Sequence, residues 1–263
     1  MERLKNKSLY LLDMDGTIYF ENELIDGAAD FLKSLRDNGK DYIFMTNNSS
    51  KSSGDYLKKL KNLNIPADES NIFTSGQATG NYLLGLKKNP RIYLVGTESL
   101  KKELISMGIE VSEDGKGDID YVLVGYDTEL TYRKLEIASG LLDDGIPFYA
   151  TNPDVVCPAK NKRYLPDCAT MCYMLNKATG KEPFYIGKPR KEMALSAVSY
   201  KGKKPEDAVL VGDRIYTDIA CGLNAGILTV MVLSGESTVE DIEKYNIHPD
   251  IVTDSVKDLI VKN

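Results

Sequence analysis

Short apolar runs rich in β-branched and aromatic residues alternate with segments of helical periodicity along almost the whole chain. The runs are "LYLL", "YIFM", "RIYLVG", "YVLVG", "PFYA", "PFYIG", "AVLVGD" and "LTVMVL". Between them lie helical patterns such as "DGAADFLKSLRDNG", in which Asp26 is expected to cap the helix, and "GDYLKKLKNL". Parallel strands need crossover connections, which are usually helices. The alternation therefore predicts an α/β fold with Rossmann-like parallel sheets flanked by helices.

A change of composition divides the chain into segments. From about Tyr82 to Glu182 it passes through strand–helix units of its own, with loops such as "SEDGKGDID". The segments before and after this stretch resemble each other in strand character more than either resembles the middle. We expect a discontinuous core domain of residues 1–79 and 183–263, with a second α/β domain, residues 80–182, inserted into it.

Composition excludes several classes of function. The 263 residues include 33 Lys and Arg against 39 Asp and Glu, a formal charge of −6, which does not suit nucleic acid or an anionic membrane. The charged first eight residues and the short apolar run after them fit neither a signal peptide nor a transmembrane helix. The four cysteines form no C-x-x-C pair and are expected to be reduced thiols in a cytoplasmic protein. A single histidine, His248, cannot form a zinc cluster.

Polar side chains follow four of the apolar runs. In an open α/β sheet, ligands bind outside the carboxyl ends of the strands. The residues at these ends are Asp13 and Asp15 after "LYLL", Thr46, Asn47 and Asn48 after "YIFM", Lys188 after "PFYI", and Asp213 and Asp218 after "AVLV". We expect these strand ends to lie at one sheet edge and to form a site there.

The residue types at these ends suit phosphoryl transfer. Asp13, Asp15 and Asp213 supply hard oxygen ligands, which suit an octahedral Mg²⁺ that keeps several waters. Thr46 and Asn47 add neutral donors for phosphate oxygens, and Lys188 adds a positive charge. Phosphoryl transfer needs mainly positioning and charge neutralisation, and this set of residues provides both.

Each motif alone has a purely structural interpretation. Asp15-Gly16 could be the turn of a β-hairpin, and a Lys before Pro is usually a solvated loop residue. "GDRIYTD" could begin a helix, with Asp213 as its cap and Asp218 on an exposed face. The order of the motifs and their shared place after strands favour a functional site.

Taken together, "DMDGT", "TNN", "GKP" and "GDRIYTD" resemble the haloacid dehalogenase (HAD) superfamily of Mg²⁺-dependent aspartyl phosphotransferases. "ATNPD" at Ala150–Asp154 and "FYIGKP" at Phe184–Pro189 are similar to its class IIA branch of NagD-like and p-nitrophenyl phosphatases. The resemblance covers nearly the whole chain. It implies a HAD core and an α/β cap domain inserted between the second and third motifs.

The resemblance also implies roles. Asp13 is the expected nucleophile and Asp15 the expected general acid–base. The metal ligands are expected to be Asp13, the main-chain carbonyl of Asp15, and Asp213. The remaining expected site residues are Thr46, Asn47 and Lys188 on the phosphoryl group, Asp218, Asn48, Arg214 and Thr217 around them, and Asn152 and Asp154 from the cap.

The leading hypothesis is a cytoplasmic Mg²⁺-dependent phosphatase acting on a small phosphomonoester. The resemblance suggests a sugar phosphate, a nucleoside monophosphate or a similar ester, with p-nitrophenyl phosphate hydrolysed in vitro. A cap that excludes water argues for a small substrate. A phosphomutase and a non-enzymatic phosphorelay receiver remain alternatives. A homodimer through the cap is a further expectation.

Overall fold

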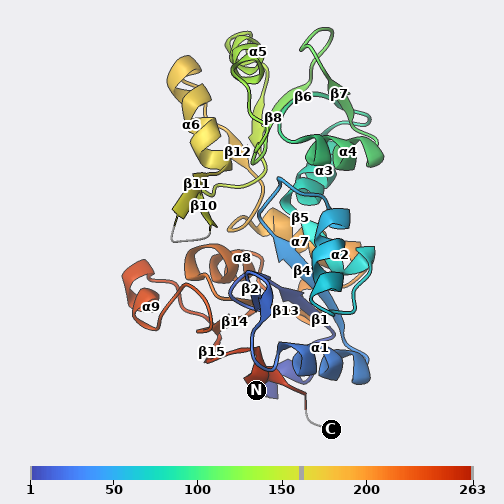
Figure 1. Cartoon of the computed structure of the whole chain (residues 1–263), viewed down its shortest axis with the longest axis vertical. Coiled ribbons are helices and arrows are strands. Elements are labelled where there is room, and N and C mark those ends of the chain that lie inside the picture. Colours follow the sequence, from blue (N-terminus) through green and yellow to red (C-terminus); the bar gives the residue numbers. More distant parts are fainter. Residues whose placement is uncertain (1, 160–162, 262–263) are drawn as a thin grey trace. The chain divides into compact units, whose positions relative to one another are not determined.

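The computed structural model describes residues 2–159 and 163–261, and contacts between residues group them into two compact units. The first unit comprises Met1–Thr46, Asp55–Phe73 and Lys188–Asn263, and the second comprises Asn47–Gly54 and Thr74–Gly187. In Figure 1 the first unit carries colours from both ends of the sequence. The assignment of residues 1–79, 80–182 and 183–263 to core and cap remains a proposal.

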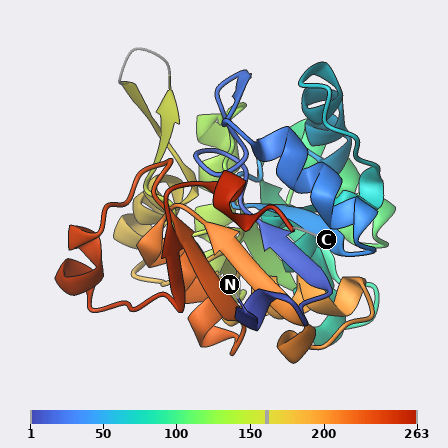
Figure 2. The ribbon, with the colours of Figure 1, turned by 90° about the horizontal axis from the view of Figure 1, so that it is seen from below.

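A six-stranded sheet forms the centre of the first unit in the part of the chain that the structure describes. Its order is β15-β14-β13-β1-β4-β5, and β1 pairs in parallel with both β13 and β4 (Figure 2). The chain leaves β1 toward β4 and β5 and later returns on its other side through β13, β14 and β15. The carboxyl end of β1 is thus a topological switch point, where open α/β sheets bind ligands. The strands are β1 (Leu9–Leu12), β4 (Asp41–Thr46), β5 (Ile72–Thr74), β13 (Ala208–Gly212), β14 (Leu228–Val232) and β15 (Ile251–Thr253).

Side chains alternate between the two faces of this sheet. Tyr10 and Leu12 of β1 pack with Phe31 of helix α1 (Ala28–Asp37). Helix α7 (Lys191–Tyr200) also contacts β1. The central strands β1 and β13 are buried along their whole length and are apolar, as parallel strands covered on both faces are. The helices of this unit are α1 (Ala28–Asp37), most of α2 (Ser53–Asn62), α7 (Lys191–Tyr200), α8 (Ala220–Asn224) and α9 (Glu240–Tyr245).

The Asp15-Gly16 turn does not make a hairpin from β1. Gly16 has φ of +88°, in the left-handed region that glycine adopts easily. The chain after it forms a small antiparallel ribbon of β2 (Tyr19–Phe20) and β3 (Glu23–Leu24), while β1 keeps its two parallel partners. The hairpin interpretation is therefore wrong. The expected cap of α1 is also wrong, since the N-cap is Gly27 and Asp26 instead forms an ion pair with Lys257.

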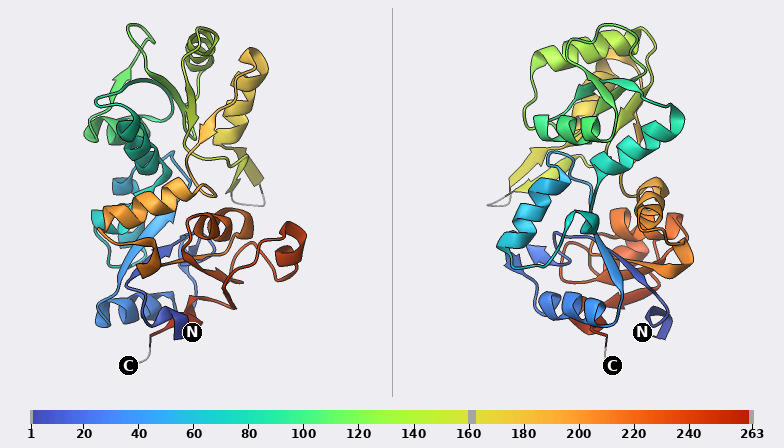
Figure 3. Two further views of the ribbon diagram at one scale, coloured as in Figure 1. Left: turned by 180° about the vertical axis from the view of Figure 1, so that it is seen from behind. Right: turned by 90° about the vertical axis from the view of Figure 1, so that its right-hand side faces the viewer.

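The second unit has a five-stranded parallel sheet of its own in the described part of the chain, with the order β12-β9-β8-β6-β7. One face packs on α5 and α6 and the other on α3 and α4, as the left view of Figure 3 shows. Its strands are β6 (Arg91–Val95), β7 (Glu110–Ser112), β8 (Tyr121–Val124), β9 (Phe148–Ala150) and β12 (Phe184–Tyr185), with a hairpin of β10 (Val156–Ala159) and β11 (Arg163–Pro166). Its helices are α3 (Ser75–Leu86), α4 (Glu98–Ser106), α5 (Tyr132–Asp143) and α6 (Cys168–Thr179).

The α/β prediction is confirmed, with one correction to the strand ends. The run "PFYI" was expected to end at the same sheet edge as "LYLL". It forms β12, which pairs with β9 in the second unit's sheet. An apolar run looks the same in either sheet, so its local sequence cannot show which one it joins. In the stretches 2–159 and 163–261, the structure has no helix both long and apolar enough to cross a bilayer.

Candidate active site

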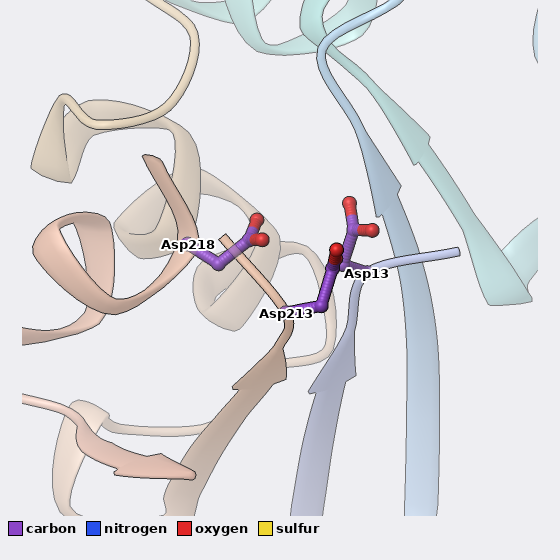
Figure 4. Close-up of side chains that lie close together, drawn as sticks. All are labelled: Asp13, Asp213 and Asp218. Atoms are coloured by element: carbon purple, nitrogen blue, oxygen red, sulfur yellow. The ribbon is translucent and has the colours of Figure 1, made fainter. Parts of the chain in front are cut away.

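Three carboxylates meet at the switch point of the first unit's sheet. Asp13 follows β1, Asp213 follows β13, and Asp218 lies in a short π-helical turn, Ile215–Ile219. One oxygen from each lies within 4.8 Å of the others, and Figure 4 shows the three side chains close together. Asp213 and Asp218 are only 2% and 1% exposed, which excludes the interpretation of Asp218 as a solvated helix face.

The side chain of Lys188 lies among these carboxylates. Its Nζ donates to Asp13 Oδ1 at 2.5 Å, to Asp218 Oδ1 at 2.6 Å and to the Met45 carbonyl at 3.4 Å. Lys188 is 3% exposed, so it is not a solvated loop residue. Although Lys188 does not follow a strand of this sheet, its side chain reaches the expected site.

The electrostatics of the cluster show a shortage of positive charge. Burial, the Asp218 carboxylate and the Asp213 carboxylate raise the pKa of Asp13 well above its usual value, although Lys188 lowers it. Burial and Asp218 raise the pKa of Asp213 to about 6. Burial would lower the pKa of Lys188, but Asp13 and Asp218 hold it above its usual value. One ammonium therefore does not balance three carboxylates, two of them buried.

Replacing Asp213 with Asn is expected to stabilise the metal-free protein at pH 8. The raised pKa means that ionised Asp213 costs the folded state free energy, roughly 3 kcal/mol at most, once the pH is above about 6. Below the unfolded value of 3.8 the carboxyl is neutral in both states and this cost is absent. Thermal unfolding in chelator at pH 8 and pH 4 measures the effect. A variant less stable than wild type at pH 8 would contradict this account.

Two other expected residues of the first unit have different environments. The side chain of Asp15 is 58% exposed and lies 3.7 Å from Lys59 Nζ, measured from its Oδ1. Thr46, at the end of β4, is buried, and its Oγ1 lies 3.5 Å from the Tyr56 hydroxyl. The Asp15 side chain is therefore open to solvent, whereas Thr46 is enclosed by the fold.

Arg214 and Thr217 lie in the segment that follows β13. The Arg214 main-chain N–H donates to Asp218 Oδ2 at 3.1 Å, and its Nε lies 2.9 Å from Glu236 Oε2. Thr217 is buried. Arg214 thus helps to hold Asp218 through its main chain, while its side chain forms an ion pair with Glu236.

Four expected residues lie in the second unit. Asn152 is fully buried, and its Nδ2 donates to the Asn47 carbonyl at 2.8 Å while its Oδ1 accepts from the Asp154 main-chain N–H at 3.0 Å. Ser75 Oγ also donates to the Asn47 carbonyl, at 2.5 Å. Asn48 Oδ1 accepts from the Ser50 main-chain N–H at 2.9 Å. Asn152 therefore fixes the main chain at Asn47, a role that the sequence did not suggest.

Sequence reasoning missed the loop after β14, "SGES" at Ser234–Ser237. The Glu236 main-chain N–H donates to Asp213 Oδ2 at 2.7 Å, which places this loop at the carboxylate cluster. The run "LTVMVL" predicts a strand, and the loop lies directly after its carboxyl end. The strand-end rule that found Asp13 and Asp213 finds this loop as well.

The carboxylate cluster fits a divalent metal ion in its donor chemistry. Its ligand atoms are carboxylate oxygens, the type that hard cations such as Mg²⁺ and Ca²⁺ prefer. A divalent ion held by these carboxylates would also offset their mutual repulsion, which contributes to the raised pKa values of Asp13 and Asp213.

Known proteins match this chain along most of its length. The haloacid dehalogenase-like hydrolase family matches residues 10–110, and a HAD-hydrolase-like family matches residues 185–259. An acid sugar phosphatase of Staphylococcus epidermidis is 37% identical over 258 residues, covering 98% of this chain and 97% of the relative. One of Staphylococcus aureus is 35% identical over 256 residues, covering 97% and 96%.

Solved structures agree with these matches. A 4-nitrophenylphosphatase from Thermotoga maritima superposes with a TM-score of 0.92 at 36% identity, covering 98% of each chain. NagD from Escherichia coli K-12 has a TM-score of 0.88 at 29% identity, covering 95% of this chain and 97% of its own. The receiver hypothesis is wrong, because the matching families are hydrolases and the relatives phosphatases. By the motifs, the fold and these relatives, the chain belongs to the haloacid dehalogenase-like hydrolases, as a phosphatase of their NagD-like branch.

Proposed function

We propose that this phosphatase hydrolyses small phosphomonoesters with Mg²⁺, through an aspartyl-phosphate on Asp13. The observation that carries the proposal is the placement of Lys188 Nζ, 2.5 Å from Asp13 Oδ1, with Asp213 and Asp218 in the same cluster. A cation fixed beside a carboxylate suits a site where phosphoryl oxygens approach that carboxylate. The divalent ion, when bound, supplies further neutralisation of phosphoryl charge.

The proposed chemistry has two displacement steps. A carboxylate oxygen of Asp13 forms a bond to phosphorus as the ester O–P bond breaks, and Asp15 gives a proton to the leaving alcohol. A water then attacks phosphorus, loses a proton to Asp15, and releases inorganic phosphate and the Asp13 carboxylate. The Asp15 side chain is 58% exposed and that of Asp13 is 15% exposed beside Lys188, which supports this division of roles.

We propose that other residues hold the ion and the phosphoryl group. The ion's ligands are Asp13, the Asp15 main-chain carbonyl and Asp213, with Asp218 holding Lys188 beside them. Thr46, Asn47 and Lys188 bind phosphoryl oxygens. The residues proposed to complete the site are Asn48, Arg214, Thr217, Asn152 and Asp154.

The substrates proposed are sugar phosphates or nucleoside monophosphates, with p-nitrophenyl phosphate as a laboratory substrate. The names of the staphylococcal and Thermotoga relatives support sugar phosphates and p-nitrophenyl phosphate within this range. A screen of about a hundred phosphate esters, with release of inorganic phosphate as the readout, tests it. The same assay separates a phosphatase from a phosphomutase, because a phosphatase releases one phosphate for each ester consumed. Isomerised sugar phosphate without free phosphate would support the mutase.

Two properties of the whole protein are also proposed. None of the four cysteines, all of which lie in the described stretches, forms a disulfide, which supports a reducing cytoplasmic location, testable by cell fractionation. Val156, Tyr164 and Leu165 of the β10–β11 hairpin are exposed apolar residues, which supports a homodimer through this hairpin. A stable dimer has a dissociation constant below roughly 50 µM. A protein that is still monomeric in sedimentation velocity at about 50 µM would therefore exclude the dimer.

Removing divalent ions is expected to stop the reaction reversibly. Without the ion, the negative phosphoryl group would be repelled by the carboxylates of the cluster. Lys188 alone would offset that repulsion only in part. We expect at least about a 100-fold loss of p-nitrophenyl phosphate hydrolysis in EDTA and full recovery in excess Mg²⁺. EDTA already saturated with Mg²⁺ is the control. Activity that is indifferent to EDTA would refute the metal assignment.

A further inference from the structure

The loop Ser234–Ser237 contacts both of the turns that carry the proposed metal ligands. It follows β14, whose neighbour β13 ends beside Asp213. Gly235 and Glu236 are exposed, whereas Ser237 is buried. All of the contacts described below lie within the first unit.

Its first set of contacts is with Asp213. The Glu236 main-chain N–H donates to Asp213 Oδ2 at 2.7 Å, and the Ser237 main-chain N–H donates to the Asp213 carbonyl at 3.2 Å. Ser237 Oγ also accepts from the Ile215 main-chain N–H at 3.0 Å. Asp213 is thus held at its side chain and at its main chain, and the residues after it are held by the same loop.

Its second contact is with the turn after Asp15. Ser234 Oγ donates to the Gly16 carbonyl at 2.8 Å. On the other side of Asp213, Thr17 Oγ1 lies 3.4 Å from Asp213 Oδ1. One short loop therefore connects the turn that bears Asp13 and Asp15 with the turn that bears Asp213.

Two glycines enclose the Asp213 side chain. A Cβ placed on Gly235 would lie 2.0 Å from Asp213 Oδ2 and 2.5 Å from Asp213 Cβ, and a Cβ on Gly16 would lie 2.5 Å from Oδ2. Real Cβ atoms do not approach so closely, so any side chain at Gly235 displaces the carboxylate or the loop. Gly235 does not have the left-handed φ of Gly16, so its need for glycine comes from this close approach.

We infer that the loop Ser234–Ser237 is a positioning element for the Asp213 carboxylate, and that its main-chain donor at Glu236 and the small size of Gly235 set the affinity for the divalent ion. The inference rests on the proposed function. Groups that orient a metal ligand typically change metal affinity by about 10- to 100-fold when they are altered.

The test is to replace Gly235 with Ala and measure metal binding to the metal-free protein by calorimetry with Mg²⁺ or Mn²⁺. We expect the dissociation constant to rise by about 10- to 100-fold. The KM for p-nitrophenyl phosphate at saturating metal is expected to stay within about twofold of wild type. The reason is that the loop acts on a metal ligand, Asp213, and not on the residues proposed to bind phosphoryl oxygens. Gly140→Ala is the matched control, since no atom lies within 4 Å of a Cβ there and its backbone is helical.

A second pair of variants keeps the inference testable if Gly235→Ala does not fold. Ser234→Ala removes the hydroxyl that donates to Gly16, whereas Ser234→Thr keeps it. Weaker metal binding in the Ala variant and recovery in the Thr variant would support the inference. If wild type binds metal and neither Gly235→Ala nor Ser234→Ala binds it more weakly, the inference is refuted. If wild type itself binds no divalent ion, the proposed function fails instead.

Discussion

Replacing Asp13 with Asn is expected to lower kcat by at least about 10³-fold while the protein stays folded. The amide keeps the shape of the carboxyl, and its oxygen can still accept from Lys188 Nζ, but it does not form a bond to phosphorus. Since the pKa of Asp13 is raised well above its usual value, a neutral side chain at this position costs the fold little. Steady-state hydrolysis of p-nitrophenyl phosphate and circular dichroism measure the two effects.

The control for this variant is an Asp→Asn change on an exposed helix. Asp143, in the last turn of α5, is exposed, and Asp143→Asn is expected to keep wild-type activity. If the Asp13→Asn protein retained activity within about threefold of this control, Asp13 could not be the nucleophile.

Replacing Lys188 with Met is expected to have the largest effect on stability. Lys188 is 3% exposed and holds Asp13 and Asp218 within 2.5 and 2.6 Å of its Nζ, so its loss leaves buried carboxylates without their cation. Breaking a buried ion pair by removing one partner typically costs about 3–5 kcal/mol. For a protein of this size that corresponds to a fall in Tm of roughly 6–20 °C. The measurement is thermal unfolding in chelator at pH 8, above the pKa of about 6 for Asp213.

A second substitution separates charge from packing in this variant. Adding Asp218→Asn to Lys188→Met removes one uncompensated carboxylate and is expected to restore part of the lost Tm. Lys181→Met, at an exposed position, is the matched control and is expected to unfold like wild type. No loss of Tm in Lys188→Met would mean that the three carboxylates do not depend on this ammonium.

The elements of the fold are predictable from local patterns, but the order of the strands is not. Each apolar run identified in the sequence forms a strand, because parallel strands covered on both faces must be apolar along their length. Nothing local to "LYLL" or "AVLVGD" shows that β1 and β13 are neighbours. Their pairing depends on packing between distant parts of the chain, and "PFYI" was placed in the wrong sheet for this reason.

Asp13 and Asp213 of the candidate site were predictable because each directly follows a buried strand. Asp13 and Asp213 interrupt apolar sequence, and burying a charge there is costly unless it has a partner. The loop Ser234–Ser237 also follows a strand, but its residue types do not mark it as a site. It acts through main-chain N–H groups, a serine hydroxyl and the small size of Gly235, none of which identifies a site by residue type.

Transfer of the phosphoryl group to Asp13 is tested most directly by trapping the aspartyl-phosphate intermediate. Wild type and Asp13→Asn are mixed with a ³²P-labelled phosphate ester and Mg²⁺, quenched in acid within milliseconds, and digested for peptide mapping. We predict that wild type carries label on the peptide containing Asp13, that hydroxylamine removes it as expected for an acyl phosphate, and that Asp13→Asn carries none. Label on another residue, or equal label in both proteins, would contradict the account.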